Sequence, residues 1–333
     1  MKRRNFLKLG GAGVAGAVAV GTGLLSWTAR ARATSIVQTY YITSGSIAQG
    51  DGASVYFEGF SSSETGLDVP AKPFIVQEGD NVSVTIINTL SQSHSFVIDG
   101  VVNSGPIAAG KIVTVSFTAP QAGSYFFYDA LNAPYNRLVG LHGGMAVMPS
   151  GISNQLYAGS PTFVQQYFWV FNDIDPTWNS AIQKGITPTT AYTPKYFTIN
   201  GLGARPPGAP DAGNPDVDAM SNLKTRLQGS VGDRTLIRVF NAGQGTNSVH
   251  WHGNHVEWLT QNGQIRPAIW LKDAVPLRGN MGSIDVIYPF SAPPDAYPPV
   301  TTGIYPMHLH NEMTQTSGGG LYLFGALTDI EFA

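Results

Sequence analysis

The chain of 333 residues contains no cysteine, which excludes disulfides, thiolate metal ligands, iron–sulfur clusters and thiol catalysis. Charged residues are also scarce, at 12%, and the formal net charge of −2 argues against a nucleic-acid-binding protein. The sequence has no phosphate-binding loop and no Gly-x-Ser-x-Gly nucleophile motif. Hydrophobic residues at 43% exclude a disordered chain, and the length suffices for two ordinary domains.

Residues 1–33 have the pattern of an export signal. Basic residues 2–8 precede an apolar, glycine-rich run over 9–25, and Ala31-Arg32-Ala33 is a small-x-small cleavage site. The paired arginines with Phe-Leu-Lys resemble a twin-arginine leader, which implies a periplasmic or secreted protein, exported folded. A membrane anchor is the alternative, but the apolar run is short for a span. Without the leader, 13 Lys and Arg face 21 Asp and Glu, and the resulting charge of −8 disfavours anionic partners.

The rest of the chain is patterned as short β-strands. Runs such as Val82–Ile87 and Ile112–Phe117 are rich in β-branched residues with a period near two, and Gly, Pro, Asn and Asp separate them. No long stretch has the 3.6-residue period of an amphipathic helix. The pattern predicts an all-β sandwich protein.

Two segments of this β region repeat each other at an offset of 153 residues. Gly79-Asp80 matches Gly232-Asp233, Asn88 matches Asn241, and residues 94–100 match residues 247–253. A second match, at an offset of 180, joins residues 123–143 to residues 303–323. The repeat predicts two tandem β-sandwich domains over residues 34–152 and 161–333.

Five of the seven histidines lie in the second domain, and four of them form two His-x-His pairs: His250, His252, His308 and His310. In a strand, residues i and i+2 point to the same face, so each pair presents two imidazoles side by side. If the two strands are neighbours, the four imidazoles converge. Neutral imidazole suits copper, zinc, iron or nickel, and the spacing therefore predicts a metal site.

The motifs around these histidines resemble those of a known family. His250-Trp251-His252-Gly253 is similar to the His-x-His-Gly motif of multicopper oxidases, and residues 305–312 with 318–327 resemble their closing segment. The resemblance covers both domains and extends to the two-domain copper nitrite reductases. It implies two Greek-key cupredoxin-like sandwiches, copper as the cofactor, and a homotrimer in which the first domain of one subunit faces the second domain of the next.

The sequence departs from this family at the blue (type 1) copper site. The cysteine of the closing His-Cys-His motif is replaced by Leu309, and the equivalent position of the first domain is Asp129. The type 1 histidine is Asn247 in the second domain, whereas the first domain keeps it as His94. Since neither leucine nor aspartate supplies a thiolate, neither domain can form a blue site.

The oxygen-reducing trinuclear cluster of the family is also incomplete. It needs four His-x-His pairs, and the matching positions of the first domain are Val97, Asp99, Tyr128 and Ala130. Half of the ligands are missing, so the family's oxygen reduction is not expected. A four-histidine site for one copper ion, or two, remains, to which a neighbouring subunit could add Asp99, Tyr128 or Asp129.

The other polar candidates are secondary. His142 matches Tyr322, which is not a ligand position, and is expected to be structural. His255, Glu257 and Glu312 lie close in sequence to the pairs and could orient an imidazole by a hydrogen bond, as metal-bound histidines require. The two glutamates could equally be surface groups.

Three functions stay open. The first is an exported copper-binding oxidoreductase that takes electrons directly from a small-molecule or metal-ion reductant, with no membrane contact after leader removal. The second is a non-enzymatic copper carrier or a cupredoxin scaffold for a partner protein. The third is a cupin-like iron, zinc or manganese enzyme, because His250-x-His252 with Glu257 and Gly263 resembles the first cupin motif. The second cupin motif is absent, and the repeat fits cupredoxins better.

The absence of cysteine makes a spectroscopic prediction. The copper-loaded protein will lack the intense visible charge-transfer band of blue proteins, because that band requires a copper–thiolate bond. An absorption spectrum of the purified, copper-loaded protein tests this, and an intense blue colour that follows the copper content would contradict the interpretation.

Overall fold

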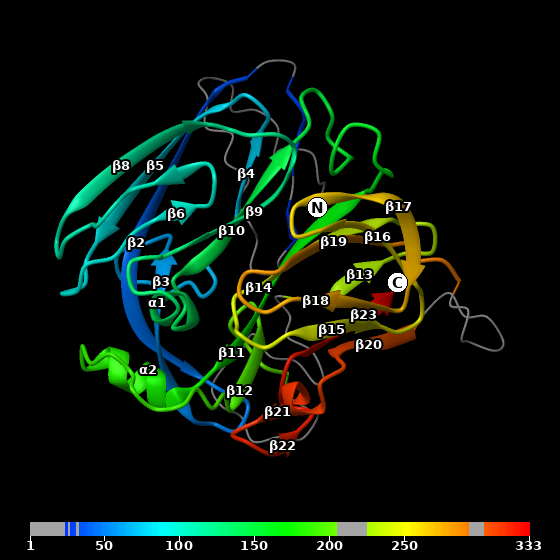
Figure 1. Cartoon of the computed structure of the whole chain (residues 1–333). Helices are drawn as coiled ribbons and strands as arrows, with labels where there is room; N and C mark the ends of the chain where they lie inside the picture. The colour runs from blue at the N-terminus through cyan, green and yellow to red at the C-terminus, as the bar shows by residue number, and fades with distance from the viewer. Residues whose placement is uncertain (1–23, 26, 31–32, 205–224, 293–302) are drawn as a thin grey trace, which may run out of the picture.

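The computed structural model describes residues 24–25, 27–30, 33–204, 225–292 and 303–333. Most of the expected leader, including its twin arginines and all but the last two residues of its apolar run, lies outside these residues. Within the described part, no helix is long and apolar enough to cross a membrane. Almost all regular structure is β (Figure 1), which confirms the predicted all-β fold class.

The first repeat is a sandwich of two sheets. The first sheet has the order β3 (Ser54–Ser61), β2 (Ser35–Ala48), β5 (Asn81–Asn88), β8 (Ile112–Thr118). The second has the order β4 (Phe74–Gln77), β10 (His142–Met148), β9 (Gly123–Tyr128), β6 (Val97–Ile98), β7 (Val102–Asn103). Alternation along the strands buries one face of each sheet: Val82, Val84 and Ile86 of β5 point into the core between them.

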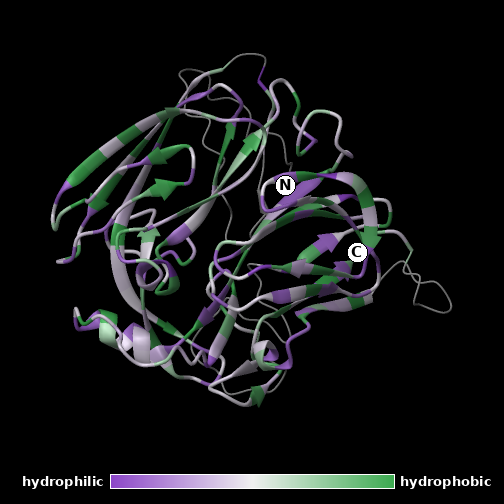
Figure 2. Cartoon of the chain, in the orientation of Figure 1, coloured by the Kyte–Doolittle hydropathy of each residue, from purple (hydrophilic) through white to green (hydrophobic). Residues whose placement is uncertain are grey.

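The second repeat is a larger sandwich. One sheet has the order β1 (Leu24–Leu25), β11 (Gln165–Ile174), β14 (Thr235–Asn241), β19 (Ser283–Tyr288), β16 (Val256–Gln261), β17 (Gln264–Lys272), with β12 (Tyr196–Ile199) also paired to β11. The other has the order β13 (Leu227–Gly229), β23 (Leu327–Phe332), β20 (Gly303–Leu309), β15 (Asn247–Trp251), β18 (Ala274–Leu277). Figure 2 shows hydrophobic and hydrophilic residues alternating along many of these strands.

The remaining elements are short. They are α1 (Tyr135–Leu138), α2 (Pro176–Gln183), the 3-10 helix η1 (Glu312–Gln315), and the hairpin of β21 (Thr316–Ser317) and β22 (Leu321–Tyr322). The α2 helix belongs to an excursion between β11 and β12 that packs against β3 of the first repeat (Figure 1).

The two repeats use the same hydrogen bonds at matching turns. Asp80 and Asp233 each accept from the backbone N–H three residues earlier, at 2.7 and 2.8 Å. Asn88 and Asn241 each donate from the side-chain amide to the carbonyl four residues later, at 2.7 and 2.8 Å. The sequence repeat therefore reflects a repeat of local structure.

A buried apolar layer joins the two repeats. Phe126 of β9 and Phe168 of β11 both stack on Phe240 of β14, each with ring centroids 5.2 Å apart. The sheets approach closely because β10 has a glycine at the contact: a Cβ on Gly144 would lie 1.8 Å from the Phe168 ring. The fold requires Gly144 for this close packing.

A buried arginine adds polar contacts across the same junction. Arg238 of β14 is fully buried and donates to Gln166 at 3.0 Å and to Ser124 of the first repeat at 2.8 Å. Ser124 in turn donates to Asp285 at 2.5 Å. Burial lowers the pKa of Arg238 to about 10, and the charge of Asp285 opposes that shift, so the guanidinium stays charged at neutral pH.

The described residues before β2 contact both repeats. β1 pairs with the edge of β11, and the partly buried Trp27 packs on the apolar layer between the repeats. Arg30 forms an ion pair with the buried carboxylate of Asp80. The backbone N–H of Thr34 donates to the other oxygen of the same carboxylate, at 2.8 Å.

The packing at Gly144 predicts a large loss of stability on substitution. Gly144→Ala places a methyl group inside the Phe168 ring position and will lower the free energy of unfolding by about 1–3 kcal/mol or more, the range for overpacked cores. Gly320→Ala is the matched control, since no atom lies within 4 Å of its Cβ position. Thermal unfolding of both variants tests this, and equal transition temperatures would contradict it.

Candidate metal centre

Two neighbouring strands of the second repeat bring the two His-x-His pairs together. β15 and β20 are antiparallel, and His250 lies directly opposite His308. Trp251 and Leu309 point to the other face, where both are buried in the core of the second sandwich. The alternation of these strands therefore places the imidazoles on the outer face of the sheet.

Three of the imidazoles form a compact group. Ligand atoms of His250, His252 and His308 lie within 4.8 Å of one another, the one such group of histidines or acids among the described residues. The Nε2 atoms of His252 and His308 are 3.2 Å apart. All three side chains are half-buried, so the group is reached from solvent.

His310 lies at the other end of this row of rings. Its ring centroid is 4.4 Å from that of His250 and 5.7 Å from that of His308. His252 occupies the opposite end, at 4.4 Å from His250. The structure thus places all four predicted ligands on one face, but only three of them form the compact group.

Neighbouring atoms favour neutral imidazoles with a nitrogen lone pair available. The Nδ1 of His308 lies 3.2 Å from the carbonyl oxygen of Leu309, and donation there leaves Nε2 as the ligand atom. The Nδ1 of His250 is buried, has no hydrogen-bond partner among the described residues, and lies 4.0 Å from a carboxylate oxygen of Asp273. Burial, and then the adjacent imidazoles, lower the pKa of His250 to about 4. His250 is therefore in its metal-binding protonation state at neutral pH.

The acids near the pairs do not orient these imidazoles. The Glu257 carboxylate pairs with Arg234 at 2.7 Å. Glu312 is exposed at the start of η1, and His255 is exposed as well. In the described part of the chain, the Leu309 carbonyl lies beside His308 and the Asp273 carboxylate lies beside His250, and neither residue is one of the three candidates chosen for their closeness in sequence.

The equivalent strand pair of the first repeat carries no histidines and packs against the second repeat. Val97 of β6 lies opposite Tyr128 of β9, as His250 lies opposite His308. Val97 and Tyr128 belong to the apolar layer between the repeats. This sheet face is therefore buried in the first repeat, whereas the equivalent face of the second repeat, which carries the histidines, is open to solvent.

Asp129, proposed as a ligand for a neighbouring subunit, is not available for that role. Its side chain is completely buried, and the two carboxylate oxygens accept hydrogen bonds from His94, Ser95, Asn136 and the backbone N–H of Leu131. The expectation that Asp129 could bind a neighbour's copper is wrong because the residue lies inside its own domain. The other two residues that a neighbouring subunit could add to the site are hydrogen-bonded to each other: the Tyr128 hydroxyl donates to Asp99 at 3.1 Å.

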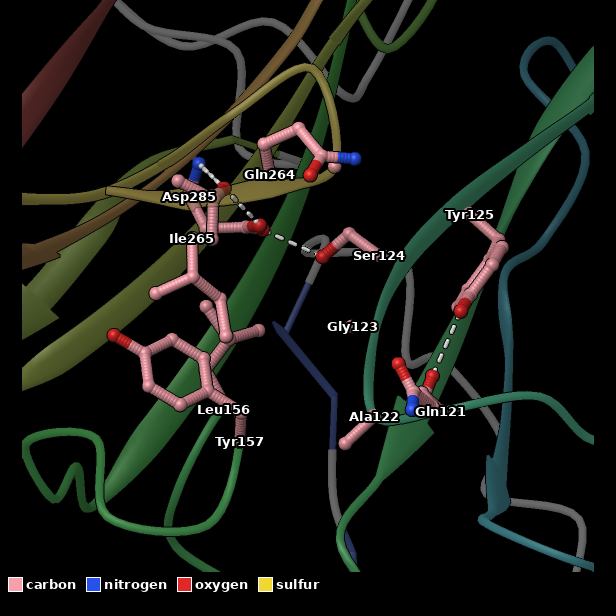
Figure 3. A pocket seen from close by; sticks show the side chains of 12 residues that line it. Gln121, Ala122, Gly123, Ser124, Tyr125, Leu156, Tyr157, Gln264, Ile265 and Asp285 are labelled. Carbon is pink, nitrogen blue, oxygen red and sulfur yellow. Dashed lines mark hydrogen bonds between the residues drawn. The ribbon is translucent and has the colours of Figure 1, made fainter. Parts of the chain in front are cut away.

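Apart from the histidine group, a hollow of about 330 Å³ lies at the junction of the repeats (Figure 3). Asp285 lines it, but one of its oxygens accepts from Ser124 and the other from Thr260, both at 2.5 Å. Because both oxygens are already hydrogen-bonded, this hollow offers no unpaired acid for catalysis. The histidine group is the stronger candidate site.

Comparisons with known proteins agree with this architecture. Residues 65–151 match the family model described as multicopper oxidase. The matched segment lies in the first repeat, and the likeness of the whole chain to this family is one of fold. The resemblance inferred from the histidine motifs is confirmed. No curated protein sequence matches the chain.

Solved structures extend the likeness to both repeats. The multicopper oxidase mgLAC superimposes with a TM-score of 0.69 at 21% identity, covering 90% of this chain and 86% of its own. The blue copper oxidase of Nitrosomonas europaea gives 0.68 at 19% identity, with coverages of 90% and 86%. The copper nitrite reductase of the same organism gives 0.66 at 17% identity, with coverages of 90% and 94%. At these identities, the likeness establishes the fold alone.

His142 lies apart from the metal-ligand group, as expected of a structural residue. It is buried, its Nδ1 donates to the carbonyl of Arg137 at 2.7 Å, and its ring stacks on Phe126. Burial lowers the pKa of His142 to about 4.

This pKa predicts an acid-sensitive contribution to stability. Because the folded-state pKa lies below the unfolded value of about 6.5, the contribution is complete above pH 6.5 and is lost as pH falls towards 4. The loss amounts to about 3 kcal/mol. Denaturant unfolding of His142→Gln, which keeps a donor but cannot titrate, should show a flatter pH profile than the wild type over this window. Parallel profiles would contradict the assignment.

Proposed function

We propose that the protein is an exported copper-binding oxidoreductase that binds copper at His250, His252 and His308, with His310 beside them, and has no type 1 copper. The observation that carries the proposal is the compact group itself, with donor atoms of three imidazoles within 4.8 Å. Copper(II) binds nitrogen sites more tightly than the other common divalent ions. The multicopper oxidase fold of the chain supports the choice of copper over a cupin-type metal.

The donor set fits copper and defines the role of each residue. His308 is held by its Nδ1 contact to a backbone carbonyl, so its Nε2 lone pair faces His252. Burial keeps His250 neutral at physiological pH. Bound copper supplies one-electron redox chemistry. Because the chain has no thiolate through which electrons could enter, a reductant must deliver its electrons directly to the histidine site.

A copper carrier is the second candidate, and the position of His310 favours it. His310 is exposed at the end of the row, whereas His250 and His308 are half-buried. An ion could therefore pass from solvent to His310 and then to the inner imidazoles. Catalysed oxidation of phenols or metal ions by the copper-loaded protein supports the oxidoreductase. Stoichiometric transfer of copper to a chelator or protein, without such turnover, supports the carrier.

Single substitutions test the site. His308→Ala removes a member of the compact group and will weaken copper(II) binding at least about tenfold, equivalent to about 1.4 kcal/mol. His310→Ala alone will weaken it less, and the double variant will lose tight binding. His255→Ala, an exposed histidine outside the row, is the matched control. Titration calorimetry and electron paramagnetic resonance measure affinity and nitrogen coordination, and full affinity in the double variant would refute the proposed site.

Export and assembly belong to the same proposal. Cleavage after Ala33 gives a mature chain that begins at Thr34, and N-terminal sequencing of protein expressed with its leader tests this. The proposed homotrimer would cover the open histidine face with a neighbouring first domain. Light scattering that finds only monomer would remove that part of the proposal.

A further inference from the structure

A small pocket lies between the first repeat and the excursion that carries α2, and it includes none of the four histidines of the row. It has a volume of about 70 Å³ and is bounded by β3, α1, the segment before β6 and the segment after α2. Its buried floor includes Glu58 and His94, whose exposed fractions are 2% and 1%. Gln92 and Asn132 lie at its exposed rim.

The imidazole of His94 is oriented from behind by a buried carboxylate. The Nδ1 of His94 lies 2.8 Å from Asp129, which is completely buried. Ser95, Asn136 and the backbone N–H of Leu131 also donate to Asp129, as an ionised carboxylate requires. Donation from Nδ1 to Asp129 leaves the Nε2 of His94 as a nitrogen lone pair. This Nε2 atom is buried and has no hydrogen-bond partner among the described residues.

Glu58, which lines the same pocket, carries a second unpartnered atom. Its Oε1 accepts from the Tyr56 hydroxyl at 2.9 Å, whereas Oε2 is buried without a hydrogen-bond partner in the described structure. Burial raises the pKa of Glu58, and although His94 opposes this shift, the charge of Asp129 adds to it. No described lysine or arginine forms an ion pair with Glu58. A cation bound beside this carboxyl would favour its charged form and oppose the effect of burial.

We propose that this pocket is a second metal site, in which the Nε2 of His94 and the Oε2 of Glu58 bind one divalent first-row cation such as zinc. The juxtaposition of two buried, unpartnered donors in one cavity carries the proposal, because each such atom left unpaired costs about 1–3 kcal/mol. A cation bonds to both donors and neutralises the buried charge. The amide oxygens of Gln92 and Asn132, or solvent, complete the coordination from the rim.

The site differs in chemistry from both family copper centres. Its donors are one imidazole and one carboxylate, a set that suits zinc and similar borderline cations and contains no thiolate. Asp129 is a positioning residue: it holds the His94 ring and tautomer without contacting the metal, as carboxylates behind metal-bound histidines do. Glu58 comes from β3, outside the strands that carry the family's histidine motifs.

Cobalt(II) and zinc(II) binding test the proposal in the full chain. The experiment uses a His308→Ala/His310→Ala background, so that the result does not depend on the copper site of the second repeat. We expect one cobalt(II) per chain, displaced by zinc(II), with an optical spectrum of mixed nitrogen and oxygen coordination. Adding Glu58→Gln, which keeps the size of the side chain but removes its charge, will weaken binding at least about tenfold. Glu64→Gln, an exposed acid near the same strand, is the matched control.

The Asp129→Asn variant in the same background separates positioning from binding. It will weaken cobalt(II) binding by about 10–100-fold and alter the cobalt spectrum, because the His94 ring loses its carboxylate partner. Circular dichroism and thermal unfolding show whether each variant folds. If Asp129→Asn does not fold, the comparison of Glu58→Gln with Glu64→Gln tests the proposal by itself. Equal affinities of the Glu58→Gln and Glu64→Gln proteins, or no binding to the background protein, would overturn the proposal.

Discussion

The candidate centre depends on one pairing register. His250 lies opposite His308 only because β15 and β20 align Val249 with Leu309 and Trp251 with Met307. All four of these apolar side chains are buried in the core of the second sandwich. A slip of one residue would turn the imidazoles into that core and expose the apolar residues, so hydrophobic burial fixes the register and, with it, the metal ligands.

The two repeats share their turns but use the equivalent sheet face differently. In the first repeat, the Val97–Tyr128 pair packs against β11 and β14 and helps to join the domains. In the second repeat, the corresponding His250–His308 pair stays open. The equivalent strand pair is therefore part of an interface in the first repeat and carries imidazoles in the second, within the same fold.

The sequence predicted the features that depend on local period and on repetition. His-x-His spacing on strands was enough to place each pair on one face, and the repeat located the equivalent positions. The sequence did not show which residues far apart in the chain pack together in the fold. His310 lies one residue beyond the end of β20, outside the paired register, and Glu58 and His94 line one pocket although they are 36 residues apart in sequence. The expectation that Asp129 could bind a neighbour's copper failed for the same reason, because the hydrogen bonds that hold it inside its own domain join residues distant in sequence.

The contact of Asp80 with both Arg30 and Thr34 connects the fold to the maturation of the chain. The Asp80 carboxylate is buried, and removing the cation from a buried ion pair strongly destabilises the folded state. Cleavage after Ala33 would remove Arg30, but it would also turn the backbone N–H of Thr34, already 2.8 Å from Asp80, into an ammonium group. The buried charge would then be balanced before and after processing, by a side chain in the precursor and by the new terminus in the mature protein.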